Sequence, residues 1–254
     1  MTALLMSLTL PLAAAAQSGA VYVNHEKVTA ALAKGAVLLT APNVTVAGAR
    51  RDKPGPLETE KGTTILYVTD GQATLVTDGQ TKALAKGDVI VIPARAARSF
   101  KDVSPSISYY LVTVPVLVAG EKSTPSFVGH EKVEPTFKKA GPLADGPNLK
   151  VSGGYRTGPY APEDYRPDVE VHASEADLFY VIDGNATLVT GGTVIGGRTT
   201  APGQIRGSSV EGGQTHHLSK GDVMWVPPGV PHWFPQIPQP LSYLLVKVLA
   251  PVTK

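Results

Sequence analysis

The sequence contains no cysteine, which excludes thiol nucleophiles, thiolate metal sites and disulfide bonds. A strong excess of charge is also missing. The 23 Lys and Arg residues stand against 21 Asp and Glu residues, and the net charge of +2 is too small to predict a nucleic-acid partner. No phosphate-binding loop, dinucleotide-binding glycine motif or nucleophile elbow is present. These absences exclude thiol enzymes and several large classes of nucleotide-binding and hydrolytic enzymes.

Long apolar runs are scarce, apart from one at the N-terminus. Residues 4–16 are almost wholly apolar, and three alanines before Gln17 form a small-residue cleavage site. The run is too short to span a bilayer. We expect residues 1–16 to be a cleaved export signal, with a buried N-terminal helix as the alternative because no Lys or Arg precedes the run. Export predicts a periplasmic or secreted protein without a membrane partner after cleavage.

Turn residues and short β-forming runs dominate the rest of the chain. The 26 Gly and 22 Pro residues suit many short strands joined by tight turns. Three Asp-Gly pairs, at 70–71, 78–79 and 183–184, lie between or just after such runs and predict hairpins. Only residues 28–34, with a counterpart near 133–139, predict short helices. The pattern therefore predicts an all-β fold.

Four motifs occur twice in the same order, which indicates an internal duplication. The spacing between copies is 105 residues at first and grows to 113 and then 134, so the second copy has gained residues. The pairs are HEKV at 25–28 and 130–133, NVTV and NLKV at 43–46 and 148–151, ILYVTDGQATLVT and LFYVIDGNATLVT at 65–77 and 178–190, and KGDV at 86–89 and 220–223. We expect two β domains, at residues 17–120 and 121–254.

The larger gain, residues 193–214, lies between two predicted strands of the second copy and is rich in Gly, Ser and Thr. Such a segment is either a lid or extra hairpin over a barrel mouth, or a surface excursion without a role.

Carboxylates and imidazoles gather in the second copy. Glu170 and His172 are two residues apart, so on a strand both side chains leave the same face. Asp177 follows, and His232 comes after a Pro-Pro-Gly corner that can bring it opposite them. Two imidazoles with one or two carboxylates suit Fe(II), Mn(II) or Zn(II). The alternatives are a metal-free pocket for acid–base work and a structural polar cluster.

These motifs resemble the cupin superfamily, and the duplication makes the chain similar to a bicupin. The family's first motif, G-x5-H-x-H-x3,4-E-x6-G, is matched in spacing, with Glu170 at its first His, His172 at its second His and Asp177 at its Glu. The second motif, G-x5-P-x-G-x2-H-x3-N, is matched from 221 to 236, with His232 at its His and Gln236 at its Asn. The resemblance implies two tandem jelly-roll β-barrels, the second holding a divalent metal ion (Fe, Mn or Zn) through Glu170, His172, Asp177 and His232.

The first copy lacks such a set. The repeat offsets place Leu57, Thr59, Thr64 and Arg98 at the four positions. We therefore expect a site in the second barrel alone.

The resemblance implies a metal-dependent enzyme of oxygenase, isomerase, decarboxylase or lyase type acting on a small molecule, with Glu170 and Asp177 as catalytic carboxylates. Arg156 is a candidate clamp for an anionic substrate, and Tyr180 and Trp225 are candidate pocket residues; a surface ion pair and core packing are the alternatives. The rival hypothesis is a non-catalytic binding or sensing protein. Barrel edges are compatible with a homodimer.

Overall fold

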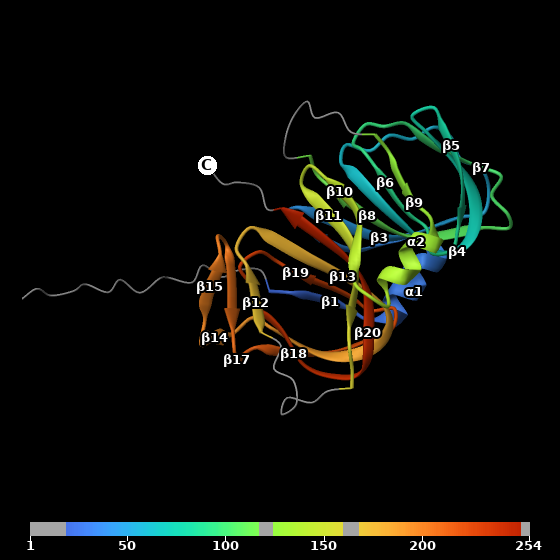
Figure 1. The fold of residues 1–254 in the computed structure, drawn as a ribbon. Coiled ribbons are helices and arrows are strands. Elements are labelled where there is room, and N and C mark those ends of the chain that lie inside the picture. The colour runs from blue at the N-terminus through green and yellow to red at the C-terminus, as the bar shows by residue number, and fades with distance from the viewer. Residues whose placement is uncertain (1–18, 117–123, 160–167, 250–254) are drawn as a thin grey trace, which may run out of the picture.

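Two β-rich units make up the computed structural model, which describes residues 19–116, 124–159 and 168–249 (Figure 1). The predicted export signal and the predicted domain boundary at 120–121 lie outside the described residues. Within the described ranges, no helix has the length and apolar composition needed to cross a membrane. The all-β prediction is confirmed, since strands dominate both units and the described residues contain only two short helices.

The N-terminal unit is built on one sheet of eight strands. The strands are ordered β2-β3-β8-β4-β6-β9, and β5 and β7 pair with the far half of the long strand β4. Its strands are β2 (Ala36–Ala41), β3 (Val44–Arg51), β4 (Thr63–Thr77), β5 (Gln80–Ala85), β6 (Val89–Ile92), β7 (Arg98–Lys101), β8 (Ile107–Val114) and β9 (Ser126–Val128).

The C-terminal unit repeats this plan with longer strands. The strands are ordered β1-β19-β13-β20-β12-β16-β15, with β18 on β13 and the hairpin β10–β11 on β20. They are β1 (Val21–Val23), β10 (Gly141–Gly146), β11 (Leu149–Arg156), β12 (Val169–His172), β13 (Glu175–Thr190), β15 (Arg198–Ala201), β16 (Gln204–Gly207), β18 (Gln214–Ser219), β19 (Val223–Val226) and β20 (His232–Leu249).

The insertion in the second copy forms strands of its own. β14 (Thr193–Ile195) pairs with β17 (Ser209–Glu211), and β15 and β16 form a hairpin between them. β16 pairs with β12 along its whole length. The extra-hairpin interpretation of residues 193–214 is therefore confirmed.

The two units exchange one strand each. β1 begins the chain's described part yet pairs with β19 of the C-terminal unit, and β9 pairs with β6 of the N-terminal unit. The helices α1 (His25–Lys34) and α2 (His130–Thr136) follow these strands and lie near the junction of the units (Figure 1). Both begin three residues before the predicted helical segments, at the repeated histidine.

A buried aspartate from the opposite unit fixes the start of each helix. Asp222 accepts a hydrogen bond of 2.6 Å from the backbone N–H of His25, and Asp88 accepts one of 2.7 Å from the N–H of His130. A carboxylate is favourable at this end of a helix because the first N–H groups have no partner within the helix. The repeated HEKV and KGDV motifs are thus the two halves of one contact, made twice between the units.

The three Asp-Gly pairs have different outcomes. Asp78-Gly79 joins β4 to β5 in a two-residue hairpin with positive φ at both residues, as predicted. The hairpins predicted at 70–71 and 183–184 are wrong, because β4 and β13 continue through them with a shift in register. A Cβ atom at Gly71 or Gly184 would lie 1.9 Å from a carbonyl oxygen of the neighbouring strand, so glycine allows the close approach.

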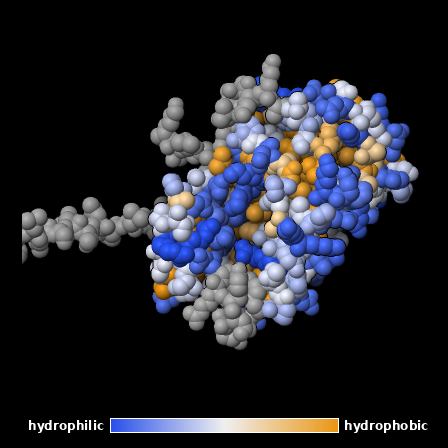
Figure 2. Space-filling view, in the orientation of Figure 1, coloured by the Kyte–Doolittle hydropathy of each residue, from blue (hydrophilic) through white to orange (hydrophobic). Residues whose placement is uncertain are grey.

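The apolar side chains form three clusters. One lies inside each barrel, and the third is shared by the two units across the exchanged strands. The shared cluster contains Tyr110, whose ring is stacked 4.9 Å from that of Tyr180 of the other unit. Hydrophobic residues also reach the surface near the middle of the view in Figure 2, with hydrophilic residues around them.

Candidate metal centre

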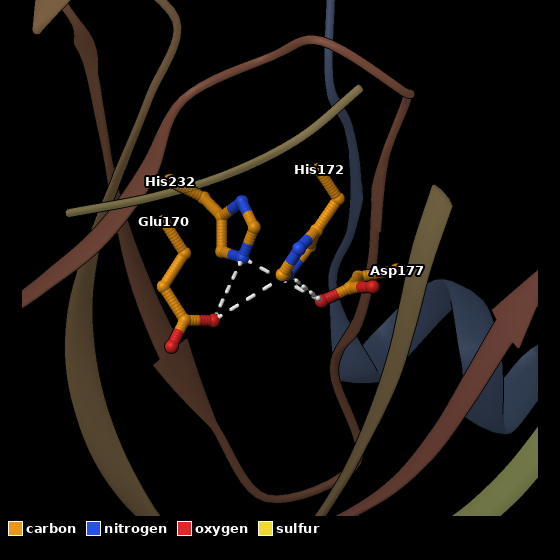
Figure 3. A group of neighbouring side chains, drawn as sticks. All are labelled: Glu170, His172, Asp177 and His232. Carbon is orange, nitrogen blue, oxygen red and sulfur yellow. Dashed lines mark ion pairs between the residues drawn. The ribbon is translucent and has the colours of Figure 1, made fainter. Parts of the chain in front are cut away.

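Four polar side chains converge inside the C-terminal barrel (Figure 3). Glu170 and His172 extend from the same face of β12, Asp177 comes from the start of β13, and His232 is the first residue of β20. Glu170 and His232 are also paired across the sheet, so the backbone register holds them side by side. The structure thus brings together all four residues that the two motifs predict as metal ligands.

The ligand atoms are evenly spaced. Nε2 of His172 lies 3.6 Å from a Glu170 oxygen and 3.5 Å from an Asp177 oxygen, and Nε2 of His232 lies 3.5 Å from each of the same two oxygens. All four atoms lie within 4.8 Å of one another. Ligands of one ion with bonds of about 2.1 Å are separated by about 3–3.5 Å, so the spacing fits a single ion.

Three of the four side chains are withdrawn from solvent. His232, Asp177 and His172 are 2%, 3% and 5% exposed, whereas Glu170 retains 29% of its exposure. The cluster is therefore accessible to solvent on one side, which is the side where Glu170 lies.

Each imidazole is oriented by a contact of its other nitrogen. Nδ1 of His172 is 2.5 Å from Oε1 of Gln204, and Nδ1 of His232 is 3.4 Å from the carbonyl oxygen of Val230. Because those partners accept hydrogen bonds, each Nδ1 carries a proton and Nε2 faces the cluster. Both Nε2 atoms are buried and have no hydrogen-bond partner. Such orphaned ring nitrogens between two carboxylates are what a divalent ion would satisfy.

Cationic side chains surround the carboxylates. Nζ of Lys247 lies 2.7 Å from Oδ1 of Asp177 and leaves Oδ2 directed at the imidazoles. Nη2 of Arg206 lies 3.7 Å from Glu170. Neither Gln204, Arg206 nor Lys247 is part of a motif, so the sequence reasoning missed all three. Gln204 and Arg206 belong to the insertion.

Burial opposes charge in the cluster, yet the neighbouring opposite charges outweigh it. Burial would raise the pKa of Glu170, but His172 and His232 lower it. The pKa of Asp177 is lowered against its burial by the same two histidines, with a contribution from Lys247. Burial would lower the pKa of His172, but Asp177 and Glu170 raise it to about 9, and they also raise the pKa of His232. Without a metal ion, His172 is therefore protonated at neutral pH, and the carboxylates favour the protonated form of His232 as well.

The residues predicted to bind substrate do not lie together. Arg156 stacks on Phe234 with its guanidinium carbon 4.4 Å from the ring centre, and its charge contributes to the low pKa of Glu170. Tyr180 lies three residues after Asp177 on β13, so its side chain points to the opposite face of the sheet. Trp225 on β19 pairs with Leu178 and points to that same opposite face, and both residues pack in the cluster shared by the two units. Tyr180 and Trp225 therefore do not line the space around the cluster.

The mapping onto the first copy needs a correction of one residue. Glu58 forms a backbone bridge with Arg98, as Glu170 does with His232. The counterparts of Glu170 and His172 are thus Glu58 and Glu60 rather than the predicted Leu57 and Thr59. The loop before β13 is one residue longer than its counterpart before β4, and a fixed offset could not reveal this.

Comparisons with known proteins agree on the fold. Residues 168–248 match the family described as Cupin. A salicylate 1,2-dioxygenase from Pseudaminobacter salicylatoxidans superimposes with a TM-score of 0.68 and 10% identity over 96% of this chain and 87% of that one. The same enzyme with gentisate adducts gives 0.65 and 10% over 90% and 81%.

A cupin 2 conserved barrel domain protein from Leptotrichia buccalis gives a TM-score of 0.52 at 15% identity, over 93% of this chain and 92% of that one. Comparison with curated proteins gives no match. At these identities the likeness establishes the fold, that of two tandem cupin barrels.

Proposed function

We propose that this chain, which belongs to the cupin superfamily, binds one divalent metal ion in its C-terminal barrel and acts with it as an enzyme on a small organic molecule. The observation that carries the proposal is the pair of buried, unpartnered Nε2 atoms of His172 and His232, which face two carboxylates at 3.5–3.6 Å. A bound ion would supply Lewis acidity and, in the case of iron, a binding position for oxygen.

The chain's own residues divide the work by their surroundings. His172, His232 and Asp177 are buried and held by further contacts, so they form the fixed part of the ligand set. Glu170 is the most exposed member, and Arg206 holds one of its oxygens from the solvent side. We assign Glu170, which is ionised, the acceptance of a proton from the substrate, in addition to a place in the ligand set.

Aromatic rings beside the cluster favour an aromatic or otherwise planar anionic substrate. Phe179 lies 6.3 Å from His232 and 6.0 Å from Phe234, and the ring of Phe234 carries Arg156. A guanidinium held against a ring can pair with a carboxylate in two parallel hydrogen bonds. The structural likeness to a salicylate dioxygenase, of which gentisate adducts are known, makes salicylate and gentisate the first compounds to test.

Elemental analysis of the purified, untagged protein tests the metal site. We expect about one divalent ion per chain in the parent. His172→Ala and His232→Ala should each remove most of it, because each deletes a ligand. His217→Ala is the matched control, since His217 lies exposed on β18 and should leave the metal content unchanged. A parent without metal, or ligand variants that retain it, would contradict the proposal.

Oxygen uptake and product formation with salicylate or gentisate, after loading with Fe(II), Mn(II) or Zn(II) in turn, test the enzyme. Turnover that disappears when the metal is removed supports it. Binding of the compounds without turnover under every loading would instead identify a binding or sensing protein.

We propose further that the protein is exported, on the strength of the apolar segment before Gln17. Mass spectrometry of protein recovered from outside the cytoplasm should find a new terminus near Gln17; an intact Met1 in that fraction would contradict export.

The homodimer also remains a prediction, and gel filtration, which measures the size of the protein in solution, tests it.

A further inference from the structure

The N-terminal barrel contains the counterpart of the metal cluster, and backbone contacts establish the correspondence. The N–H of Arg95 donates to the carbonyl of Glu60, as the N–H of Gly229 donates to the carbonyl of His172. Thr64 pairs with Ile92 as Asp177 pairs with Val226.

A second contact made in both units supports the alignment. Arg51 lies over Phe100, 5.1 Å from the ring centre, and bonds Glu58 at 2.6 Å. Arg156 lies over Phe234 in the same way, and its charge acts on Glu170. Together with the bridge between Glu58 and Arg98, these contacts fix the four counterparts of Glu170, His172, Asp177 and His232, which are Glu58, Glu60, Thr64 and Arg98.

Arg98 reaches each of the other three counterparts. Its side chain is 5% exposed; Nη1 donates to the hydroxyl of Thr64 at 2.8 Å, Nη2 lies 3.2 Å from Glu60, and Nε lies 3.9 Å from Glu58. A guanidinium therefore lies among two carboxylates and a hydroxyl, where the other barrel has the converging ligand atoms of two carboxylates and two imidazoles.

We propose that in the N-terminal barrel the guanidinium of Arg98 occupies the position that a metal ion takes in the C-terminal barrel. Arg98 is then the residue that prevents a divalent metal ion from binding there. A guanidinium is charged at every pH that a protein tolerates, so it balances Glu58 and Glu60 without an ion from solution. Removal of the guanidinium leaves Glu58 paired with Arg51 alone and takes from Glu60 the cation that it contacts in this barrel. A metal-ligating side chain at the same position then completes a site for a divalent ion such as Zn²⁺.

The proposal rests on the proposed metal centre for the comparison between barrels, so its test is made where that centre is disabled. Arg98→His is introduced into a chain that also carries His172→Ala and His232→Ala. This substitution puts an imidazole where the other barrel has His232. The matched control is Arg95→His in the same background, because Arg95 is an exposed arginine three residues earlier.

Zinc bound per chain, measured by elemental analysis after gel filtration of the untagged proteins, is expected to rise from none in the background to one ion with Arg98→His. It should stay at none with Arg95→His. A folded Arg98→His chain that binds no zinc would overturn the proposal. Should the variant be unfolded in metal-free buffer, Zn²⁺ must restore its folding by circular dichroism, and failure to do so overturns the proposal equally. The parent chain, measured alongside, reports on the C-terminal centre alone.

Discussion

The two imidazoles of the C-terminal cluster face a space bounded by two carboxylates, so a divalent ion can replace their two protons without changing the net charge of the buried site. Glu170 and Asp177 have lowered pKa values and stay ionised throughout the neutral range. Lys247 and Arg206 face the two carboxylates from neighbouring strands. Competition between protons and metal therefore takes place at the two histidines.

Metal affinity should rise with pH. The pKa of His172 is raised to about 9, so this imidazole must lose a proton before Nε2 can bind an ion, and the pKa of His232 is raised as well. We expect the affinity to increase by about 10-fold per pH unit from His172 alone, more steeply where His232 is also protonated, and to level off above about pH 9. Calorimetric titration with Zn²⁺ between pH 6 and 8, in two buffers with different ionisation enthalpies, measures the protons released. An affinity that does not change over this range would contradict the protonated state.

At the scale of single elements, the insertion contributes to the site through one glutamine. Gln204 on β16 fixes the ring of His172 on β12. Gln204→Ala should weaken metal binding about 10- to 100-fold, because the ring loses the partner that sets its tautomer. Competition with a chelator measures the change.

Gln214→Ala is the control for this substitution, since Gln214 ends the same insertion with an exposed side chain. Equal affinities for the two variants would show that the hairpin has no part in positioning His172.

Local sequence predicted the elements well where local geometry decides them. The hairpin at Asp78-Gly79 is right because two adjacent residues with positive φ suffice to reverse the chain. The hairpins at 70–71 and 183–184 are wrong because partner strands pair with β4 and β13 on both sides of the glycine, so the chain continues through it with a shift in register. The helix at His25 has a local start signal, since the side chain of Asn24 accepts a hydrogen bond from the N–H of Lys27. Gly129 gives the helix at His130 no such cap, and the aspartate of the opposite unit that binds each helix start comes from a segment distant in sequence.

The candidate site was predictable to the same extent. Spacing along two motifs gave all four cluster residues, since side-chain direction on a strand follows the count of residues. The prediction placed Tyr180 and Trp225 in the pocket, but both pack in the apolar cluster shared by the two units. Their packing partners include residues of the other unit, which the local sequence does not reveal. Lys247 and Gln204 could not be found, since only the sheet register places them beside Asp177 and His172.

At the scale of the whole molecule, the exchanged contacts join the two barrels. Asp222 is fully buried and accepts hydrogen bonds from His25, Tyr22 and Ser219. Asp222→Ala should lower the free energy of unfolding by about 3 kcal/mol, because it leaves several buried donors without an acceptor. Urea denaturation of the metal-free protein measures it.

Asp183→Ala serves as the control for Asp222→Ala. Asp183 makes an exposed ion pair of 3.6 Å with Lys220, and its loss should change the free energy of unfolding by less than about 0.5 kcal/mol. A similar effect of both substitutions would show that the contact between the units contributes little to stability.

The exchange of strands also sets an order of events during synthesis. β1 is the first of the described strands to be synthesised, yet its partner β19 lies about 200 residues later in the chain. The N-terminal barrel likewise lacks its last strand, β9, until Val128 has been synthesised. Residues 21–23 must therefore remain unpaired until almost the entire chain has been made, so the fold is completed only after translation is nearly finished.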